Sequence, residues 1–399
     1  MRRLILIVLA SMFLLQAKIG VWTTFCAITQ GNDLILVNNK IYVATDGGLL
    51  EFNEQGNNIY DTDNGLFKIN TTAVASDFRN IIWAGHSDCS ISLFDGNGNS
   101  KGHLSDIEEF GSFNLNRIYS SDSYIYIATD KLLTRYTYNV EFGKYEVKDS
   151  NLMTGNVSDV IVFNNAIYMA AQDEVYTVAE SSSNIGDLGD WSLLSGFDPG
   201  TIVNKFLEFE GGILVLTSNG VYAINDSIVT KESIEDGSDV LWGAVYNSEF
   251  YYTVNIGDIV FYRTDMSLAN ITVEVCRTDD TIAEKFLIEG DVIHYISKSG
   301  FSSYSTASLM TTDYSFNVPK EKGIKKIKIT KDNEKLLYLT SGGFRKFDLL
   351  SESFSEEYYT ERKIWQAKDF IEDNENNVYV CTWSTGIAKF IKNIDDYDF

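Results

Sequence analysis

One stretch of this chain decides its fold, and it reads Asn38-Asn39-Lys40-Ile41-Tyr42-Val43-Ala44-Thr45-Asp46-Gly47-Gly48-Leu49. It contains a turn, a strand of apolar and aromatic residues, a small polar residue and a second turn that is rich in glycine. Eight later copies follow at a mean spacing of about 42 residues, which is typical of β-propeller blades. Aligned on Ile41, these copies begin at Ile81, Ile125, Ile167, Ile213, Phe250, Ile293, Leu336 and Val378.

Each copy predicts one sheet of four short antiparallel strands. In the first unit we expect these strands at Leu34–Val37, Ile41–Ala44, Leu49–Phe52 and Asn58–Tyr60. The pair Asn38-Asn39 tolerates the positive φ of a two-residue hairpin turn, and Gly48 suits a tight reversal before the third strand. The sequence therefore predicts an all-β chain that forms a single β-propeller of nine four-stranded antiparallel blades. An irregular unit around Phe250 would leave eight or fewer.

The two ends of the chain suggest how the ring closes. The ninth unit offers strands at Trp365–Phe370, Val378–Cys381 and Gly386–Ile391, and we expect no fourth strand after them. A spare strand, Val21–Phe25, precedes the first complete unit. Pairing this N-terminal strand with the last blade would remove two exposed sheet edges. We therefore expect one closed ring over residues 18–399.

The first 17 residues predict a secretory signal peptide. Arg2 and Arg3 precede an apolar run from Leu4 to Leu15, and Ala17 offers a small residue for cleavage. A membrane anchor is the alternative, but the run falls well short of the roughly 20 residues of a spanning helix. The sequence thus indicates an exported protein that is periplasmic, cell-surface or secreted, without direct membrane insertion after cleavage.

The charge of the chain limits its partners. Removing Arg2 and Arg3 leaves 30 basic and 56 acidic side chains, a net charge of −26. Such a charge repels phosphate backbones and anionic lipids, so nucleic acid is not an expected partner. Acidic residues also keep a β-rich surface soluble and discourage edge pairing, which needs no ligand at all.

The repeats resemble a known type of propeller. The segments Ile41–Leu49, Gly342–Phe344 and Val378–Ile387 resemble the core of two-component-regulator propeller repeats. The N-terminal part is similar to PorZ-like exported propellers of type IX secretion systems, through Trp22, Asn39–Leu49 and the loop Asn64-Gly65-Leu66. The resemblance implies an exported propeller of a Bacteroidetes-like envelope. The chain departs from those families because it offers one ring's worth of repeats and no kinase.

No motif in the sequence indicates a reaction, a cofactor or a metal. Four cysteines, Cys26, Cys89, Cys276 and Cys381, share no spacing, so we expect thiols, with Cys381 buried in the strand position of Ala44. The loop Asp95–Asn99 has the first half of a calcium-loop pattern but lacks the glycine at position six and the glutamate at position twelve. We interpret it as a turn. No histidine has a local partner for catalysis.

The loops between second and third strands gather at one mouth of a propeller channel, and so do the connections between blades. We expect this face to be acidic and to hold the ligand or partner. Trp383 is the strongest candidate contact, because an exposed aromatic residue at a loop position normally packs on something; packing against the neighbouring blade is the alternative. The other candidates on this face are His86, Asp46, Asp88, Asp130, Asp173, Asn219, Asn255 and Lys298.

The sequence therefore favours a non-enzymatic binding or scaffold module that holds a protein or glycan of the cell envelope. One alternative is an extracellular carbohydrate-active enzyme with paired carboxylates at the channel mouth. Another is the ligand-sensing part of a split two-component signalling system.

Overall fold

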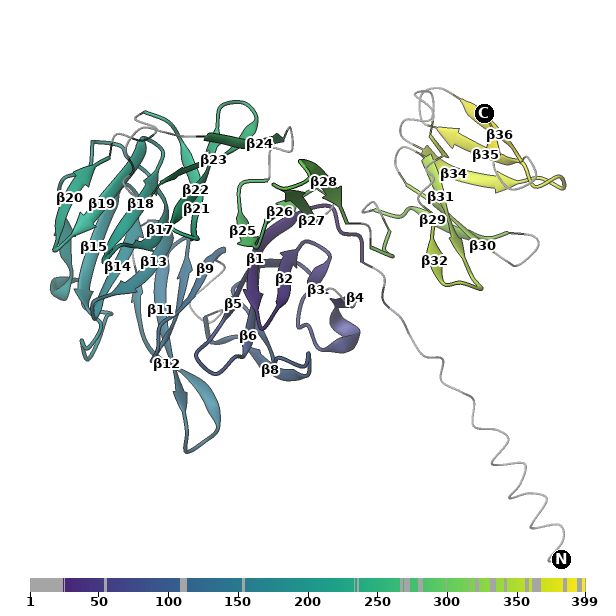
Figure 1. Cartoon of the computed structure of the whole chain (residues 1–399). Coiled ribbons are helices and arrows are strands. Elements are labelled where there is room, and N and C mark those ends of the chain that lie inside the picture. Colours follow the sequence, from purple (N-terminus) through teal and green to yellow (C-terminus); the bar gives the residue numbers. More distant parts are fainter. Residues whose placement is uncertain are drawn as a thin grey trace, which may run out of the picture.

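Nine antiparallel sheets follow one another along the chain in a computed structural model (Figure 1). The structure describes residues 24, 26–53, 56–107, 113–152, 155–232, 234, 237–265, 268, 273–278, 283–298, 300–314, 316–319, 323–330, 335–340, 343–355, 359–360, 367–382, 386–392 and 397–398. The predicted signal peptide, and all of the predicted strand at residues 21–25 except Thr24, lie outside these residues. The prediction of an all-β chain built from nine repeat units is confirmed.

In each sheet the strands lie side by side in chain order. The first four sheets consist of β1 (Gly31–Val37), β2 (Lys40–Thr45), β3 (Gly48–Asn53) and β4 (Gly56–Tyr60); β5 (Thr71–Ser76), β6 (Ile82–His86), β7 (Ile91–Phe94) and β8 (Ser100–Leu104); β9 (Leu115–Ser120), β10 (Ile125–Thr129), β11 (Leu132–Asn139) and β12 (Lys144–Leu152); β13 (Val157–Phe163), β14 (Ala166–Ala171), β15 (Glu174–Ala179) and β16 (Ser192–Leu194). Two short 3₁₀ helices, η1 (Thr62–Asn64) and η3 (Leu188–Asp190), lie in connections.

The remaining sheets repeat this plan, and β33 adds a short extra pairing to β31 in the eighth. They consist of β17 (Val203–Phe209), β18 (Gly212–Thr217), β19 (Gly220–Asn225) and β20 (Ile228–Lys231); β21 (Val240–Tyr246), β22 (Glu249–Asn255), β23 (Ile259–Asp265) and β24 (Val273–Thr278); β25 (Phe286–Glu289), β26 (Val292–Ser297), β27 (Gly300–Ser305) and β28 (Met310–Asp313); β29 (Lys326–Ile329), β30 (Lys335–Leu339), β31 (Gly343–Asp348), β32 (Ser353–Phe354) and β33 (Tyr359–Thr360); β34 (Ala367–Glu372), β35 (Val378–Thr382), β36 (Ile387–Lys392) and β37 (Tyr397–Asp398).

The predicted turns set the register of the hairpins. Asn38 and Asn39 have φ of 52° and 60°, as a type I′ turn requires, and Gly48 begins the third strand with φ of 133°. The second repeat begins one residue later than predicted, because Ile82 pairs with Phe94 as Ile41 pairs with Phe52. A slip of one residue exchanges the two faces of a strand. The register is therefore set by Ile82, which is fully buried.

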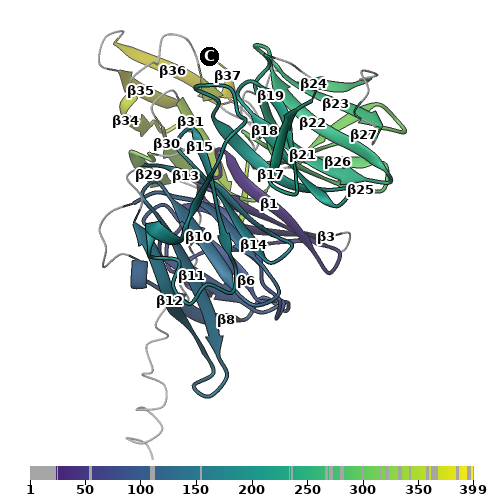
Figure 2. The same ribbon diagram turned by 90° about the vertical axis from the view of Figure 1, so that its left-hand side faces the viewer.

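The first seven sheets pack in a ring. Seven apolar clusters each join two neighbouring sheets, and the last of them joins the seventh sheet to the first through Leu34, Val43, Ile296 and Phe301. Phe52 of the first sheet also lies 5.3 Å from the Phe301 ring. The first strands touch in the same order, and β1 contacts both β5 and β25 (Figures 1 and 2). These first strands therefore line a central channel.

The eighth and ninth sheets pack on each other and not into this ring. Their shared cluster contains only their own residues, among them Leu337, Phe344 and Phe390, and Figure 1 shows them beside the ring. Because no further sheet in the described part of the chain covers the ninth, Cys381 is half-buried and lines an apolar groove with Ile371 and Ile387. The prediction that Cys381 is buried like Ala44 is wrong for this reason.

The predicted closure of a nine-bladed ring by the N-terminal strand is not detected among the described residues. The ninth sheet has its own fourth strand, β37, in which Asp398 pairs with Ile391 of β36. A local hairpin closes a short loop at a small entropic cost, so this edge needs no strand from the N-terminus. The ring instead closes where the first and seventh sheets pack, and each of these two sheets is built from its own four strands.

Substituting Gly31→Ala should weaken this seam. A Cβ at Gly31 would lie 2.2 Å from the carbonyl oxygen of Gly300 and 2.9 Å from Cβ of Ile296, both in the seventh sheet. We expect the free energy of unfolding in urea to fall by about 1–3 kcal/mol. Gly96→Ala is the control, because its nearest atom would be 3.9 Å away. Equal stability of the two variants would contradict the packing of the first sheet on the seventh.

Candidate functional site

A layer of charged side chains crosses the channel at one register of the first strands. In six sheets a β-bulge near the start of the first strand precedes this position. In the seventh sheet, Lys285 holds the same position, because the Ile296 N–H donates a hydrogen bond to the Lys285 carbonyl. We call these residues the charged layer: Asp33, Ala73, Arg117, Asp159, Lys205, Trp242 and Lys285.

The two carboxylates of the charged layer are fully or almost fully buried and lie beside cations. Asp33 lies 3.7 Å from Arg117 and 3.6 Å from Lys285, and Asp159 lies 3.3 Å from Arg117. Each carboxylate also accepts a backbone hydrogen bond from the following sheet, Asp33 from Val74 and Asp159 from Phe206. Arg117 is therefore the shared cation of both carboxylates.

Three cations of the charged layer surround one indole ring. The Lys205 ammonium lies 3.9 Å from the centre of the Trp242 ring, and Arg117 and Lys285 each lie 5.3 Å from it. Lys205 is 7% exposed. Burial, and then the nearby Arg117 charge, lowers the pKa of Lys205 to about 7, against the opposing effect of Asp159 and Asp33. Cation–π contact with Trp242 partly replaces the water that this ammonium loses.

Polar side chains one position nearer the mouth join four of the sheets to the next one. The side chains of Asn32, Asn116, Ser158 and Asn204 donate to the carbonyls of Thr71, Val157, Val203 and Val240. These residues occupy the bulges, which turn the side chains toward the neighbouring sheet. This ladder holds the first strands, and with them the charged layer, in fixed positions.

Seven of the predicted mouth residues lie at the same end of the ring, six in loops and Asn255 at the end of β22. Four of the seven bond to the segment that precedes the first strand of their own sheet. Asp46 is buried and accepts hydrogen bonds from the backbone of Thr29 and Gln30. The half-buried predicted residues have nearby partners. Asp88 pairs with Lys68 and accepts a hydrogen bond from Ser90, Asp130 accepts one from Asn114, and Asn219 donates one to Asp198. The exposed ones are Asp173, Asn255 and Lys298.

One predicted contact does not lie at this mouth, and another is outside the described residues. Trp383 is outside the described residues, and the sheet that flanks it packs on the eighth sheet instead of in the ring. His86 is fully buried inside the second sheet, where its Nε2 lies 2.8 Å from Ser92 Oγ. The spacing placed His86 in a loop, whereas it is the last residue of β6.

His86 should make the protein sensitive to acid. Burial lowers the pKa of His86 from 6.5 to about 4, so the unfolded chain binds a proton in the window between these values and the folded chain does not. Stability therefore falls as the pH falls from 6.5 toward 4. We expect His86→Gln to reduce the loss of unfolding free energy between pH 7 and pH 5 by roughly 1–2 kcal/mol. His103→Gln, at an exposed position of β8, is the control for loss of a histidine outside the core.

The remaining sequence motifs are structural where the chain is described. Asp95 accepts hydrogen bonds from the backbone of Asn97 and Asn99 and pairs with Lys101, so the calcium-like loop is a turn. No disulfide joins the four cysteines, all of which the structure describes. Within the described ranges, no three His, Cys, Asp or Glu side chains converge on a metal position, and no helix is long and apolar enough to span a membrane.

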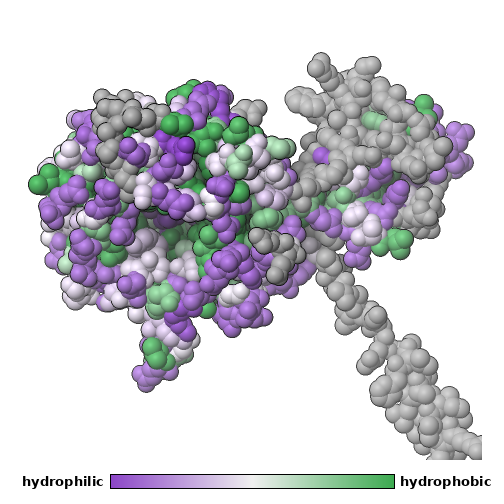
Figure 3. All heavy atoms as spheres, viewed as in Figure 1, coloured by the Kyte–Doolittle hydropathy of each residue, from purple (hydrophilic) through white to green (hydrophobic). Residues whose placement is uncertain are grey.

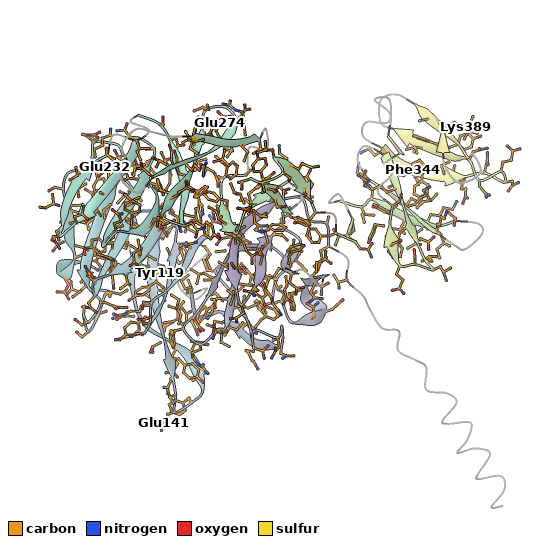
Figure 4. All side chains as sticks on the ribbon, viewed as in Figure 1. Tyr119, Glu141, Glu232, Glu274, Phe344 and Lys389 are labelled. Carbon is orange, nitrogen blue, oxygen red and sulfur yellow. The ribbon has the colours of Figure 1, made fainter. Side chains whose placement is uncertain are left out.

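Two features lie away from the mouth. A groove of about 810 Å³ opens between the seventh and first sheets, near the turns that hold Asn39 and Gly290, and contains the side chain of His294. A long hairpin, β11–β12, projects from the ring, with Glu141 at its tip (Figure 4) and with Val140 and Phe142 exposed.

Hydrophilic residues cover much of the ring surface seen in Figure 3, with smaller hydrophobic patches between them.

Sequence reasoning missed the charged layer, although a signal for it exists. In six of the seven sheets, the layer residue lies eleven positions before the strand position of Ala44, as Asp33 does. Five of the six residues at this spacing are charged and interrupt the apolar pattern of the surrounding sequence, and the sixth is Trp242. Lys326 and Asp369 hold the same register in the eighth and ninth sheets, where they form an ion pair with each other.

Comparison with solved structures shows what this architecture is similar to. PorZ, an essential bacterial surface component of the type-IX secretion system of Porphyromonas gingivalis, aligns with a TM-score of 0.69 and 15% identity over 95% of this chain and 53% of PorZ. The extracellular domain of a putative hybrid two-component system from B. thetaiotaomicron aligns with a TM-score of 0.53 and 12% identity over 94% of this chain and 53% of that one. This chain thus spans about half the length of these two proteins.

A third structure, virginiamycin B lyase from Staphylococcus aureus, aligns with a TM-score of 0.51 and 12% identity over 68% of this chain and 93% of the lyase. No protein-family model matches the sequence, and no curated protein matches it either. At these identities the similarity shows the fold alone. The predicted resemblance to PorZ-like and two-component-regulator propellers is confirmed at that level.

Proposed function

We propose that this chain is an exported β-propeller that acts as a non-enzymatic binding or scaffold module and holds a protein or glycan of the cell envelope at its channel mouth. The charged layer carries this proposal. Repeated sheets need only apolar residues to pack, yet one register of the first strands holds five charged side chains around Trp242, next to the mouth. Buried charges cost stability, so their retention favours a role in binding.

The solved structures support the setting of this function. PorZ is a surface component and the second neighbour is an extracellular domain, which favours export to the periplasm, the cell surface or the medium. The second neighbour also favours a ligand-sensing role as the alternative, and a sensor would need a kinase encoded nearby. An enzyme is the less favoured alternative, because both channel carboxylates already accept backbone hydrogen bonds and lie beside Arg117.

Capture of an envelope partner tests the proposed function. The immobilised full chain is incubated with envelope extract, and bound proteins and glycans are compared with those held by the variant Asp173→Ala/Asn255→Ala/Lys298→Ala. We expect a specific partner to be lost from this triple variant, because all three residues are exposed at the mouth, Asp173 and Lys298 in loops and Asn255 at the end of β22. The control is Val140→Ser/Phe142→Ser at the hairpin tip, which should capture normally. Equal capture by all three proteins would contradict binding at the mouth.

Trp383 stays a separate proposed contact. Trp383→Ala should reduce capture only if the partner also reaches the ninth sheet. Unchanged recovery of the partner would remove Trp383 from the site.

A further inference from the structure

We propose that the charged layer is an anion site that binds one carboxylate group between Lys205, Arg117 and Lys285. This proposal rests on the proposed binding function, and it assigns a ligand chemistry to the channel beneath the mouth. The carboxylate would be supplied by a small free acid or by the acidic side chain of a bound peptide. Both sources present the same planar, two-oxygen group.

The first observation is that the cations and carboxylates of the charged layer are not evenly paired. Asp33 is shared by Lys285 and Arg117, and Asp159 lies against Arg117. Among the described residues, no carboxylate oxygen lies within 4.0 Å of the Lys205 ammonium, and this ammonium has no hydrogen bond. Two cations therefore balance two carboxylates, and the charge of Lys205 is in excess.

The second observation is the geometry around Trp242. Since Lys205, Arg117 and Lys285 all lie within 5.3 Å of the centre of one indole ring, the three cations are close neighbours. Their mutual repulsion is strong in a poorly hydrated channel. Side chains of Arg117 and Lys285 each keep 18% exposure, so a small anion from the channel could reach both. A carboxylate there would gain charge-assisted hydrogen bonds and relieve the repulsion.

The third observation concerns burial of the ligating groups. Lys205 is more than nine-tenths buried and Trp242 is 9% exposed, so the site is built into the scaffold and not spread over the surface. Three further polar atoms of the layer, Asp33 Oδ1, Arg117 Nε and Asp159 Oδ1, are buried without a hydrogen bond in the described structure. Arg117 Nε and Asp159 Oδ1 face each other at 3.3 Å, and Asp33 Oδ1 faces Lys285 at 3.6 Å. An Arg117 N–H group that makes an ion pair but no hydrogen bond is a donor that a carboxylate oxygen can use.

Protonation links the ligand to pH. The groups that face Lys205 are Asp33 on β1, Arg117 on β9, Asp159 on β13, Trp242 on β21 and Lys285 before β25. Because the free site holds the pKa of Lys205 at about 7, this lysine is largely neutral at pH 8.5. A bound carboxylate favours the charged form, so binding takes up a proton. If only the charged lysine binds, affinity at pH 6 should exceed affinity at pH 8.5 roughly 30-fold.

Calorimetric titration of the full chain with succinate at pH 6 and pH 8.5, in chloride-poor buffers of different ionisation enthalpy, tests this inference. We expect tighter binding at pH 6 and uptake of a proton near neutral pH. Lys205→Met should abolish both effects. Lys231→Met is the matched control, because Lys231 lies on β20 at the outer edge of the same sheet. A parallel titration with acetyl-Gly-Asp-Gly-amide distinguishes an acidic side chain from a free acid, since the stronger ligand identifies the source.

Stability is followed separately, so that a misfolded variant is not mistaken for an empty site. The pKa of Lys205 is also read from the NMR signal of the ¹³C-dimethylated lysine, and it should rise when succinate is added to the wild type. Absence of binding by either carboxylate, or unchanged pH-dependent binding by Lys205→Met, would overturn the anion site. Envelope capture at the mouth would still stand in that case. Carboxylate binding by a chain that captures no envelope partner would support the anion site and contradict the proposed function.

Discussion

Arg117→Met should lower the free energy of unfolding by about 3–5 kcal/mol, because it removes the cation shared by two buried carboxylates. Asp33 would keep only Lys285, at 3.6 Å, and Asp159 would keep no cation within 4.0 Å among the described residues. Methionine fills much of the space of the arginine stem, so the loss should come from charge and not from a cavity. Urea unfolding at pH 7 measures the change.

Two further variants show whether the loss has this cause. Arg277→Met removes an exposed arginine that pairs with Glu274 and Asp258, and it should leave the unfolding midpoint almost unchanged. Adding Asp159→Asn to Arg117→Met should recover part of the stability, since asparagine still accepts the Phe206 N–H without a buried charge. A double variant no more stable than Arg117→Met would argue against the shared-cation role.

Lys205→Met should have the opposite effect and raise the free energy of unfolding at pH 6 by roughly 2–4 kcal/mol. The pKa of Lys205 is lowered from 10.5 to about 7 in the folded protein. Between these values the unfolded chain binds a proton that the folded chain does not, so wild-type stability should rise as the pH increases from 7 to 10. Below pH 7 the folded protein must hold the charge at its full cost.

Denaturation of the wild type and Lys205→Met at pH 6, 8 and 10 checks this sign. The two curves should converge at pH 10, where the wild-type lysine is neutral in the folded protein. Lys231→Met should follow the wild type at every pH. A constant difference between wild type and Lys205→Met would show that packing, not titration, causes the effect. A gain in stability on losing Lys205 is also expected of a residue kept for binding.

The fold could be predicted from the sequence wherever local chemistry decides it. Asn38 and Asn39 specify a hairpin turn whatever surrounds them, and the strand from Ile41 specifies a two-sided buried strand. Ring size could not be predicted in this way. The repeats of the eighth and ninth sheets look like the others in sequence, and only the packing of Ile296 and Phe301 on the first sheet shows that the ring is complete after seven.

The candidate site was predicted less well, for a physical reason. Loop residues such as Asp46 and Asp88 looked available because they are polar. Asp46, however, accepts a backbone hydrogen bond from Thr29, and Asp88 accepts one from Ser90 in its own turn. The charged layer lies within strands, where a charged residue reads as an outward-facing position. That Lys205 points inward follows from the bulge before it and from the closure of the ring, neither of which a single repeat reveals.

The seam between the first and seventh sheets has a consequence for how the protein is made. The first sheet leaves the ribosome early, yet its apolar face at Leu34, Ile41 and Val43 is covered by residues from Ile296 to Val318, after five further sheets have been synthesised. Such distant contacts slow folding and leave apolar surface open to aggregation. We expect nascent chains that end before β26 to depend on chaperones, and release from them to coincide with synthesis of the seventh sheet.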